Sequence, residues 1–196
     1  MKKIILASKS PRRRELLDSI GLKFEIKDSN FDESKVRFTD NAGEFTEALA
    51  YGKAKGVSDK IDEGIVLGAD TVVVLGNKIY GKPKDSKEAF EMLCSLNNKA
   101  HDVITGVAMI DSSTGRVLVE HDVTKVMFND LTNDEIMAYI KSGDYIGKAG
   151  AYGIQSKGAV LIKRIEGCYF NVVGLPLGKV CNMLKSLDED VYTHWS

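Results

Sequence analysis

The sequence lacks a net charge of either sign, because 27 lysines and arginines face 28 aspartates and glutamates and leave a formal charge of -1. Proteins that bind nucleic acid or anionic membranes generally carry a basic excess. We therefore expect neither direct nucleic-acid binding nor membrane binding, although a local basic pocket is compatible with this balance. The chain also lacks an apolar run of 18 residues, so no membrane-spanning helix is predicted.

Cysteine pairs and targeting signals are missing as well. Cys94, Cys168 and Cys181 are widely spaced and form no CxxC pair, which is typical of buried apolar residues in a reducing compartment. The apolar run near the N-terminus covers only residues 4–7, which is too short for the hydrophobic region of a signal peptide. We therefore expect a cytoplasmic protein.

Strand-like and helix-like periodicities alternate along the chain, without an internal repeat. The length suggests one domain, or two lobes that share a continuous core. We predict strands at residues 4–7, 23–27, 65–75, 78–80, 103–110, 117–127 and 159–165. We predict helices at residues 11–20, 45–57, 85–96, 132–141 and 176–187. Hairpins and crossovers both occur in this order, which indicates an α/β fold with a mixed sheet and flanking helices.

A basic cluster follows the first predicted strand, where Ser8-Lys-Ser-Pro-Arg-Arg-Arg14 opens a helix. Ser10 is a suitable N-cap, and the free N–H groups of a first helical turn attract phosphate. Arginines supply bidentate donors for phosphate oxygens, and Arg13 is predicted to point toward the body of the protein. The alternative is a solvated basic face, but cations at a helix N-terminus oppose the helix dipole. We interpret the cluster as an anion site.

Asp70 interrupts the most apolar run of the chain, residues 65–75. An unpaired carboxylate is costly to bury, so Asp70 should face a cation, a metal or a catalytic site. The alternative is a structural Asp70 that is paired with a lysine. Lys53 lies between Leu49 and Val57 on the inner stripe of a predicted helix, where a lysine more commonly extends its ammonium group to solvent.

Three further segments carry weaker signals. Lys82 lies in a loop after the predicted hairpin, and the acidic pair at residues 32–33 indicates a metal site only in the company of Asp70. Residues 147–155 are rich in glycines, which permit close approach of the backbone to a ligand, although a flexible hinge explains them equally well. The three histidines lack metal-ligand spacing, and we interpret them as structural.

Taken together, these segments resemble the Maf family of nucleoside triphosphate pyrophosphatases. The matching motifs are Leu6-Ala-Ser-Lys-Ser-Pro-Arg-Arg-Arg-Glu-Leu-Leu17, Lys53-Ala54, Gly68-Ala-Asp-Thr-Val-Val73, Gly81-Lys-Pro83, His101-Asp-Val-Ile-Thr-Gly-Val107, Gly147-Lys-Ala-Gly-Ala-Tyr-Gly-Ile-Gln155 and Asn171-Val-Val-Gly-Leu-Pro176. They occur in the family's order across residues 4–187, and the full set is much more specific than any one of them.

The resemblance implies an elongated mixed-sheet fold with two lobes around a central cleft, similar to inosine triphosphate pyrophosphatases, within a single domain at residues 1–196. It also implies hydrolysis of dTTP and UTP to the nucleoside monophosphate and pyrophosphate. The resemblance also implies roles in nucleotide-pool sanitising and in cell-division arrest. A homodimer is compatible with the sequence.

The resemblance further assigns roles to residues. Asp70 is the expected catalytic residue, and Glu33, Lys53 and Lys82 match other polar positions of the family's site. Our own hypothesis is that Glu33 and Asp70 hold a divalent metal, Mg²⁺ or Mn²⁺. The expected substrate-binding residues are Ser10, Arg12, Arg13, Lys53, Thr71, Lys82 and Gln155. Among these, Arg12, Thr71 and Gln155 fall where the dTTP/UTP-preferring subfamily determines substrate choice. The sequence leaves open whether Asp70 acts as the base, as a metal ligand or as both.

Two other functions share the same charges. A binding module could hold nucleotides and regulate division without chemistry, but such a module would not need Asp70 inside the strand. A different nucleotide hydrolase could remove only the γ-phosphate. The phosphate products distinguish all three functions.

Overall fold

The computed structural model describes residues 2–38 and 40–195. Its strands are β1 (Ile4–Leu6), β2 (Glu25–Ile26), β3 (Ile65–Leu75), β4 (Lys78–Tyr80), β5 (Ala100–Asp111), β6 (Val117–Phe128) and β7 (Ile162–Glu166). Its α-helices are α1 (Pro11–Ser19), α2 (Ala42–Ser58), α3 (Ser86–Leu96), α4 (Asn133–Lys141), α5 (Tyr169–Val173) and α6 (Leu177–Ser186). Short 3₁₀ helices are η1 (Glu33–Lys35), η2 (Ala149–Ala151), η3 (Ser156–Leu161) and η4 (Val191–His194).

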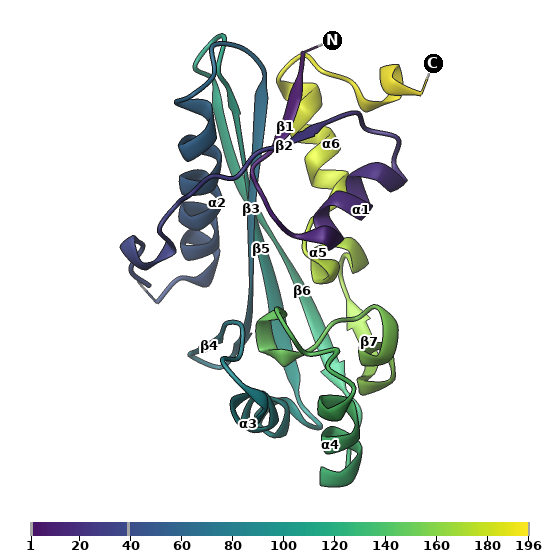
Figure 1. Ribbon diagram of the computed structural model, residues 1–196. Coiled ribbons are helices and arrows are strands. Elements are labelled where there is room, and N and C mark those ends of the chain that lie inside the picture. Colours follow the sequence, from purple (N-terminus) through teal and green to yellow (C-terminus); the bar gives the residue numbers. More distant parts are fainter. Residues whose placement is uncertain (1, 39, 196) are drawn as a thin grey trace. The chain divides into compact units, whose positions relative to one another are not determined.

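Within the described residues the strands form one seven-stranded sheet in the order β2-β1-β3-β5-β6-β7, and β4 pairs with β3. Strand β1 runs parallel to β2 and to β3, whereas β3–β4 and β6–β7 are antiparallel pairs. The predicted α/β fold with a mixed sheet and flanking helices is therefore confirmed (Figure 1). None of the described helices is long and apolar enough to cross a membrane.

The chain divides into two compact units. Unit 1 comprises Met1–Asp70, Thr105–Asp122 and Gly174–Ser196, and unit 2 comprises Thr71–Ile104 and Val123–Val173. Strands β3, β5 and β6 each contribute residues to both units, and the first boundary lies between Asp70 and Thr71.

In unit 1 the backbone of α2 lies directly against two strands. A Cβ atom added to Gly68 of β3 would lie 2.2 Å from the carbonyl oxygen of Ala50, and one added to Gly106 of β5 would lie 2.3 Å from that of Thr46. Real Cβ atoms do not approach a backbone so closely, so only glycine permits this helix–strand contact. The apolar residues that surround it form one core cluster, Ile5, Ala7, Ala50, Ala54, Val57, Val66, Ala108 and Ile110.

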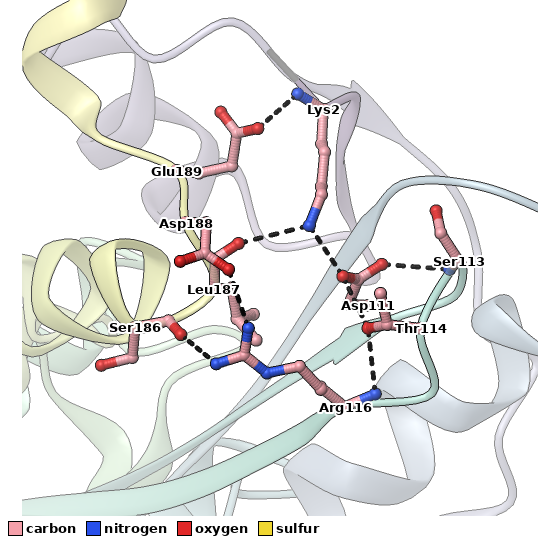
Figure 2. A network of polar contacts seen from close by, with 9 residues as sticks. All are labelled: Lys2, Asp111, Ser113, Thr114, Arg116, Ser186, Leu187, Asp188 and Glu189. Atoms are coloured by element: carbon pink, nitrogen blue, oxygen red, sulfur yellow. Dashed lines mark hydrogen bonds and ion pairs between the residues drawn. The ribbon is translucent and has the colours of Figure 1, made fainter.

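A polar network in unit 1 joins the N-terminal residues to the β5–β6 turn and to the segment after α6 (Figure 2). The ammonium group of Lys2 donates to Asp111 at 2.8 Å, and the backbone N–H of Lys2 donates to Glu189 at 2.6 Å. Burial by itself raises the pKa of Asp111, but hydrogen bonds from Lys2, Thr114 and Ser113 outweigh it and lower that pKa to about 2.

Unit 2 has its own apolar core, to which β4, α3, α4 and the loop at residues 147–155 all contribute. Helix α3 begins after Asp85, whose carboxylate accepts the N–H of Glu88 at 2.8 Å. Helix α4 begins with the predicted capping box, in which the side chains of Thr132 and Glu135 exchange hydrogen bonds with each other's backbone N–H. Local capping signals therefore positioned both helices correctly.

Several segments differ from the prediction, and among them β2 covers only Glu25–Ile26 of residues 23–27, while β5 begins at Ala100 and not at residue 103. Residues 159–161 belong to η3 and not to a strand, because Gly158 packs against the carbonyl of Gly153 and donates its N–H to Asp144 at 3.2 Å. Helices α5 and η4 were not predicted, and both are too short to show a helical period. Helix α2 begins at Ala42, three residues before the predicted start, because the Asn41 side chain accepts the first free N–H groups.

Candidate active site

Lys53 of α2 lies between two carboxylates in unit 1. Its Nζ atom donates to Asp70 Oδ1 at 2.5 Å and contacts Glu33 Oε1 at 2.8 Å. The side chains of Lys53 and Asp70 are 11% and 14% exposed, whereas that of Glu33 is 53% exposed. The structure thus brings Glu33, Lys53 and Asp70 together, and the lysine partner that the sequence left open for Asp70 is present.

The packing of α2 on β3 explains this contact. Ala54, the residue after Lys53, has its N atom 2.8 Å from the Cβ position of Gly68. Asp70 follows two residues later and therefore points to the same face of the strand as Gly68, the face that α2 covers. A buried carboxylate needs a partner, and the helix supplies the ammonium group at that point.

Arg13 is buried in unit 1, as its helical position predicted. Its Nε atom donates to the carbonyl of Gly174 at 2.8 Å, and its Nη1 atom donates to the carbonyl of Ala69 at 2.8 Å and to Ser8 Oγ at 3.2 Å. Burial lowers the pKa of Arg13, and the negative charge of Asp70 opposes that decrease. Ala69 directly precedes Asp70, so this hydrogen bond from Arg13 fixes the backbone next to Asp70.

Ser10 and Arg12 lie at the start of α1. Ser10 occupies the predicted N-cap position, but its side chain makes no capping hydrogen bond, and its backbone N–H donates to Ser8 Oγ at 3.3 Å. Arg12 is half-buried on the first turn, next to Arg13 in the sequence. The hydroxyl of Ser10 therefore does not occupy the N–H groups of this first turn.

The other three predicted site residues belong to unit 2. Thr71 follows Asp70 in β3 and is half-buried, Lys82 is exposed in the loop after β4, and Gln155 is half-buried directly before η3. The backbone N–H of Gly150 donates to the carbonyl of Gly81 at 3.0 Å. This hydrogen bond joins the loop that carries Lys82 to the loop that carries Gln155.

The glycines of the 147–155 loop were expected either to admit a ligand or to form a hinge. A Cβ atom at Gly150 would lie 2.8 Å from the side chain of Val73, and one at Gly153 would lie 2.8 Å from that of Lys148. Lys148 in turn donates to the carboxylate of Asp144 at 2.7 Å. At Gly150 and Gly153 the close approach is therefore made by the protein's own side chains.

Two further residues fix this loop in unit 2. His101 Nε2 and the hydroxyl of Tyr152 lie 2.7 Å apart, and both rings pack edge-on against Phe128. Burial lowers the pKa of His101 to about 4, and the charge of nearby Asp102 only partly opposes that shift. His101 and Tyr152 both lie in motifs of the family resemblance, but nothing in the sequence indicates that they contact each other.

The carboxylates of Glu33 and Asp70 suit a divalent metal in their chemistry. Both approach one position that a cation, the Lys53 ammonium, occupies. Mg²⁺ is commonly held by one or two carboxylates together with substrate phosphates. Within residues 2–38 and 40–195 no group of three or more histidine, cysteine, aspartate or glutamate side chains could hold a metal ion. The two carboxylates therefore fit, in their chemistry, a metal that arrives with a phosphate ligand.

Fold and site together define a mixed-sheet α/β protein with a carboxylate–lysine–carboxylate centre beside a buried arginine. The family model described as Maf-like protein matches residues 3–187. The chain therefore belongs to the Maf family, as its motifs indicated.

The relatives are similar over nearly their whole length. A dTTP/UTP pyrophosphatase of Ruminiclostridium cellulolyticum is 47% identical over 191 residues, which cover 97% of this chain and 99% of that protein. One of Clostridium botulinum is 49% identical, with 95% and 98% covered, and one of Desulforamulus reducens is 46% identical, with 97% and 100% covered. The solved structure of the Staphylococcus aureus Ham1 protein is similar with a TM-score of 0.49 and 16% identity over 82% of this chain and 80% of that one.

Proposed function

We propose that this protein hydrolyses dTTP and UTP to the nucleoside monophosphate and pyrophosphate. The observation that carries the proposal is the contact of Lys53 with both Asp70 and Glu33. This contact brings two carboxylates and an ammonium group together beside β3. Relatives that are 47% and 49% identical over nearly the whole chain carry the name of this activity. Neither a simple binding module nor a structural ion pair requires a second carboxylate on the same ammonium group.

In this proposal a water molecule attacks the α-phosphorus of the substrate. A bond forms between the water oxygen and phosphorus, the bond from phosphorus to the bridging oxygen breaks, and pyrophosphate leaves. The carboxylate of Asp70 accepts the proton of the water as general base. Positioned charges contribute most of the catalysis in such reactions, because the transition state spreads negative charge over the phosphoryl oxygens.

Lys53 is suited to stabilise that charge. An ammonium group has three N–H donors, and Asp70 and Glu33 use two of them, which leaves one for a phosphate oxygen. Glu33 and Asp70 would hold a divalent cation, Mg²⁺ or Mn²⁺, that arrives with the triphosphate. When bound, such an ion would supply positive charge next to the phosphates and would lower the pKa of the attacking water.

The remaining site residues divide into two groups. Ser10, Arg13 and Lys82 would bind the triphosphate, since basic groups and free helical N–H groups attract phosphate. Arg12, Thr71 and Gln155 would determine the choice of base, because a pyrimidine edge offers both donors and acceptors.

We further propose that both units act as one Maf-like domain, in the cytoplasm, on free nucleotides. This substrate requires neither nucleic acid nor a membrane as a partner. Removal of unwanted nucleotides from the pool, with an effect on cell division, would be the consequence in the cell, and a homodimer is compatible with it.

The products test this proposal. Incubation of UTP with the protein and Mg²⁺ in ¹⁸O-labelled water should give UMP and pyrophosphate, with the label in UMP. Label in the pyrophosphate would place the attack on the β-phosphorus and contradict the mechanism. UDP with orthophosphate would identify a hydrolase of the γ-phosphate, and tight nucleotide binding without products would identify a binding module.

A further inference from the structure

Helix α2 carries two glycines one turn apart, Gly52 and Gly56, and Ser29 and Phe31 lie against them. These two residues belong to the chain that leads from β2 toward α2 (Figure 1). A Cβ atom at Gly52 would lie 2.2 Å from the ring of Phe31, and one at Gly56 would lie 2.7 Å from the carbonyl oxygen of Ser29. Residues four apart lie on the same face of a helix, so the two glycines form one shallow groove. The two glycines, Ser29 and Phe31 all belong to unit 1.

Glycine inside a helix is destabilising relative to alanine, so two of them on one face need a reason. The groove gives that reason for Gly52 and Gly56, because any side chain there would collide with the segment that lies on it. Gly178 in α6 is different, since a Cβ atom at that position would meet nothing within 4 Å. The close approach at Gly52 and Gly56 is therefore not shared by Gly178, another helical glycine of unit 1.

The segment on the groove is also shaped by its own hydrogen bonds. Asp28 pairs with Lys9 at 2.5 Å and accepts the N–H of Asn30 at 3.2 Å, while Asn30 has a left-handed φ of 49°. Asp32 accepts the N–H of Ser34 at 3.1 Å and its hydroxyl at 2.6 Å. These contacts define the conformation of the segment, and the groove fixes it on α2.

The consequence concerns Glu33. Phe31 lies over Gly52, and two residues later Glu33 contacts the ammonium group of Lys53, the residue after Gly52. Glu33 itself lies on a three-residue 3₁₀ turn and is half-exposed, so its placement depends on how the preceding residues are held. We propose that the groove at Gly52 and Gly56, with Phe31 in it, is a positioning element that sets the Glu33 carboxylate on Lys53, beside Asp70.

This inference rests on the proposed function, because it gives Glu33 a part in the reaction. It differs from a purely structural role of the groove in one respect. A structural role affects the stability of unit 1, whereas a positioning role affects turnover through Glu33 in protein that is fully folded.

The test is Gly52→Ala, which introduces the methyl group that the ring of Phe31 excludes. We expect kcat/KM for UTP to fall between about 10-fold and 10²-fold, as displacement of a positioned group by about 1 Å can cause. Glu33→Gln should lower it by a similar factor, and the loss in the double variant Gly52→Ala/Glu33→Gln should be much less than the product of the two. Gly178→Ala is the matched control, and its kcat/KM should equal that of the natural protein.

A rescue and a second measurement distinguish positioning from damage. Phe31→Leu in the Gly52→Ala background removes ring atoms that collide with the new methyl group, so several-fold of the lost kcat/KM should return. Hydrogen exchange without substrate should be faster at residues 29–36 of Gly52→Ala and unchanged along β3. Should Gly52→Ala not fold, Phe31→Ala empties the groove without a collision and should lower kcat/KM in the same way.

Two results would overturn the inference. One is a natural kcat/KM in folded Gly52→Ala and Phe31→Ala while Glu33→Gln is impaired, since the groove would then not position Glu33. The other is a natural kcat/KM in Glu33→Gln, which removes the role of Glu33. The product analysis with labelled water is independent of both, so the pyrophosphatase proposal could still hold.

Discussion

The two units hold their candidate site residues in different ways. In unit 1, Lys53 and Asp70 lie on a helix and a strand whose backbones touch at Gly68. In unit 2, Lys82 and Gln155 lie on loops, and the loop of Gln155 is fixed by the buried pair of His101 and Tyr152. Groups on regular elements are held more firmly than groups on loops, whereas loops tolerate change and commonly carry specificity. We therefore expect substitutions at Lys53 and Asp70 to change the reaction rate most, and substitution of Gln155 to change the choice of base.

The largest expected effect comes from the centre of unit 1. Asp70→Asn keeps the shape of the side chain but removes its charge and its basicity, so kcat for UTP should fall by about 10²-fold or more. Thermal unfolding should show a folded protein, since an amide at this position is less costly to bury than a carboxylate. The choice between UTP and CTP should change little, because Gln155 and Thr71 are intact. Activity within a few-fold of the natural protein would exclude Asp70 from the mechanism.

The comparison also shows why the fold was more predictable than the contacts. Strand β3 was predicted with its observed bounds, since an apolar run between turn residues is a local signal. The capping box at Thr132 is equally local. The sequence pattern predicted a strand at residues 159–161. In the structure Gly158 contacts Gly153 and Asp144, and such tertiary contacts override local preference.

The site was predictable in its residue types but not in its partners. The cost of a buried carboxylate singled out Asp70. The helical pattern placed Lys53 on the inner stripe, but extension of its ammonium group to solvent was the commoner expectation there. The contact of Lys53 with Asp70 depends on the distance between α2 and β3, which the close approach at Gly68 sets. A single glycine in a predicted strand does not indicate which helix will pack against it. The contact of His101 with Tyr152 was not predicted either, because the two residues lie far apart in the sequence and no local pattern relates them.

The next largest effect concerns pH and unit 2. The pKa of His101 is about 4 in the folded protein and about 6.5 when unfolded, so the unfolded chain takes up a proton first as pH falls. The free energy of unfolding is therefore independent of His101 protonation above pH 6.5. It decreases as pH falls toward 4, by at most about 3 kcal/mol. Asp102 and Lys125 are the charged groups that act on His101.

Native-state hydrogen exchange between pH 7 and 4 measures this loss. Protection in unit 2 should fall over that range, and His101→Gln should flatten the dependence because glutamine does not titrate. Exchange in unit 1 provides the internal comparison and should change less above pH 4. Equal pH dependence in His101→Gln and the natural protein would show that His101 is not the titrating group.

A smaller loss is expected in unit 1 at lower pH. The pKa of Asp111 is lowered to about 2, so its carboxylate stabilises the fold above about pH 4, and this contribution is lost as pH falls through 2, by about 1–2 kcal/mol. Asp111→Asn should remove that dependence in urea unfolding between pH 5 and 2. Asp188→Asn is the control within the same network (Figure 2), because the Arg116–Asp188 pair is largely exposed, at 48% and 79%, and exposed pairs contribute about 0–1 kcal/mol. A larger loss from Asp188→Asn would reverse this ranking of the two carboxylates.

The smallest effect, and the one that bears most directly on unit 2, is the choice between UTP and CTP. Uracil presents the N3–H donor and the O4 acceptor, whereas cytosine presents the N3 acceptor and an amino donor at the same places. The amide of Gln155 offers one acceptor and one donor, and a site built on such bonds rejects a base that leaves its polar groups unpaired. We therefore expect kcat/KM for UTP and dTTP to lie far above that for CTP.

Gln155→Glu replaces the amide donor with a second acceptor, so the ratio of kcat/KM for UTP to that for CTP should fall about tenfold, equivalent to about 1.4 kcal/mol. The unfolding midpoint should change little, because the half-buried Gln155 side chain makes no capping hydrogen bond to η3. Lys157→Gln is the matched control, since it changes the charge by one unit at an exposed residue of η3, two positions after Gln155. That variant should keep the ratio, even if it weakens binding of every nucleotide equally. If the natural protein uses CTP as well as UTP, Gln155 does not contact the base edge, and the proposed preference for dTTP and UTP is wrong.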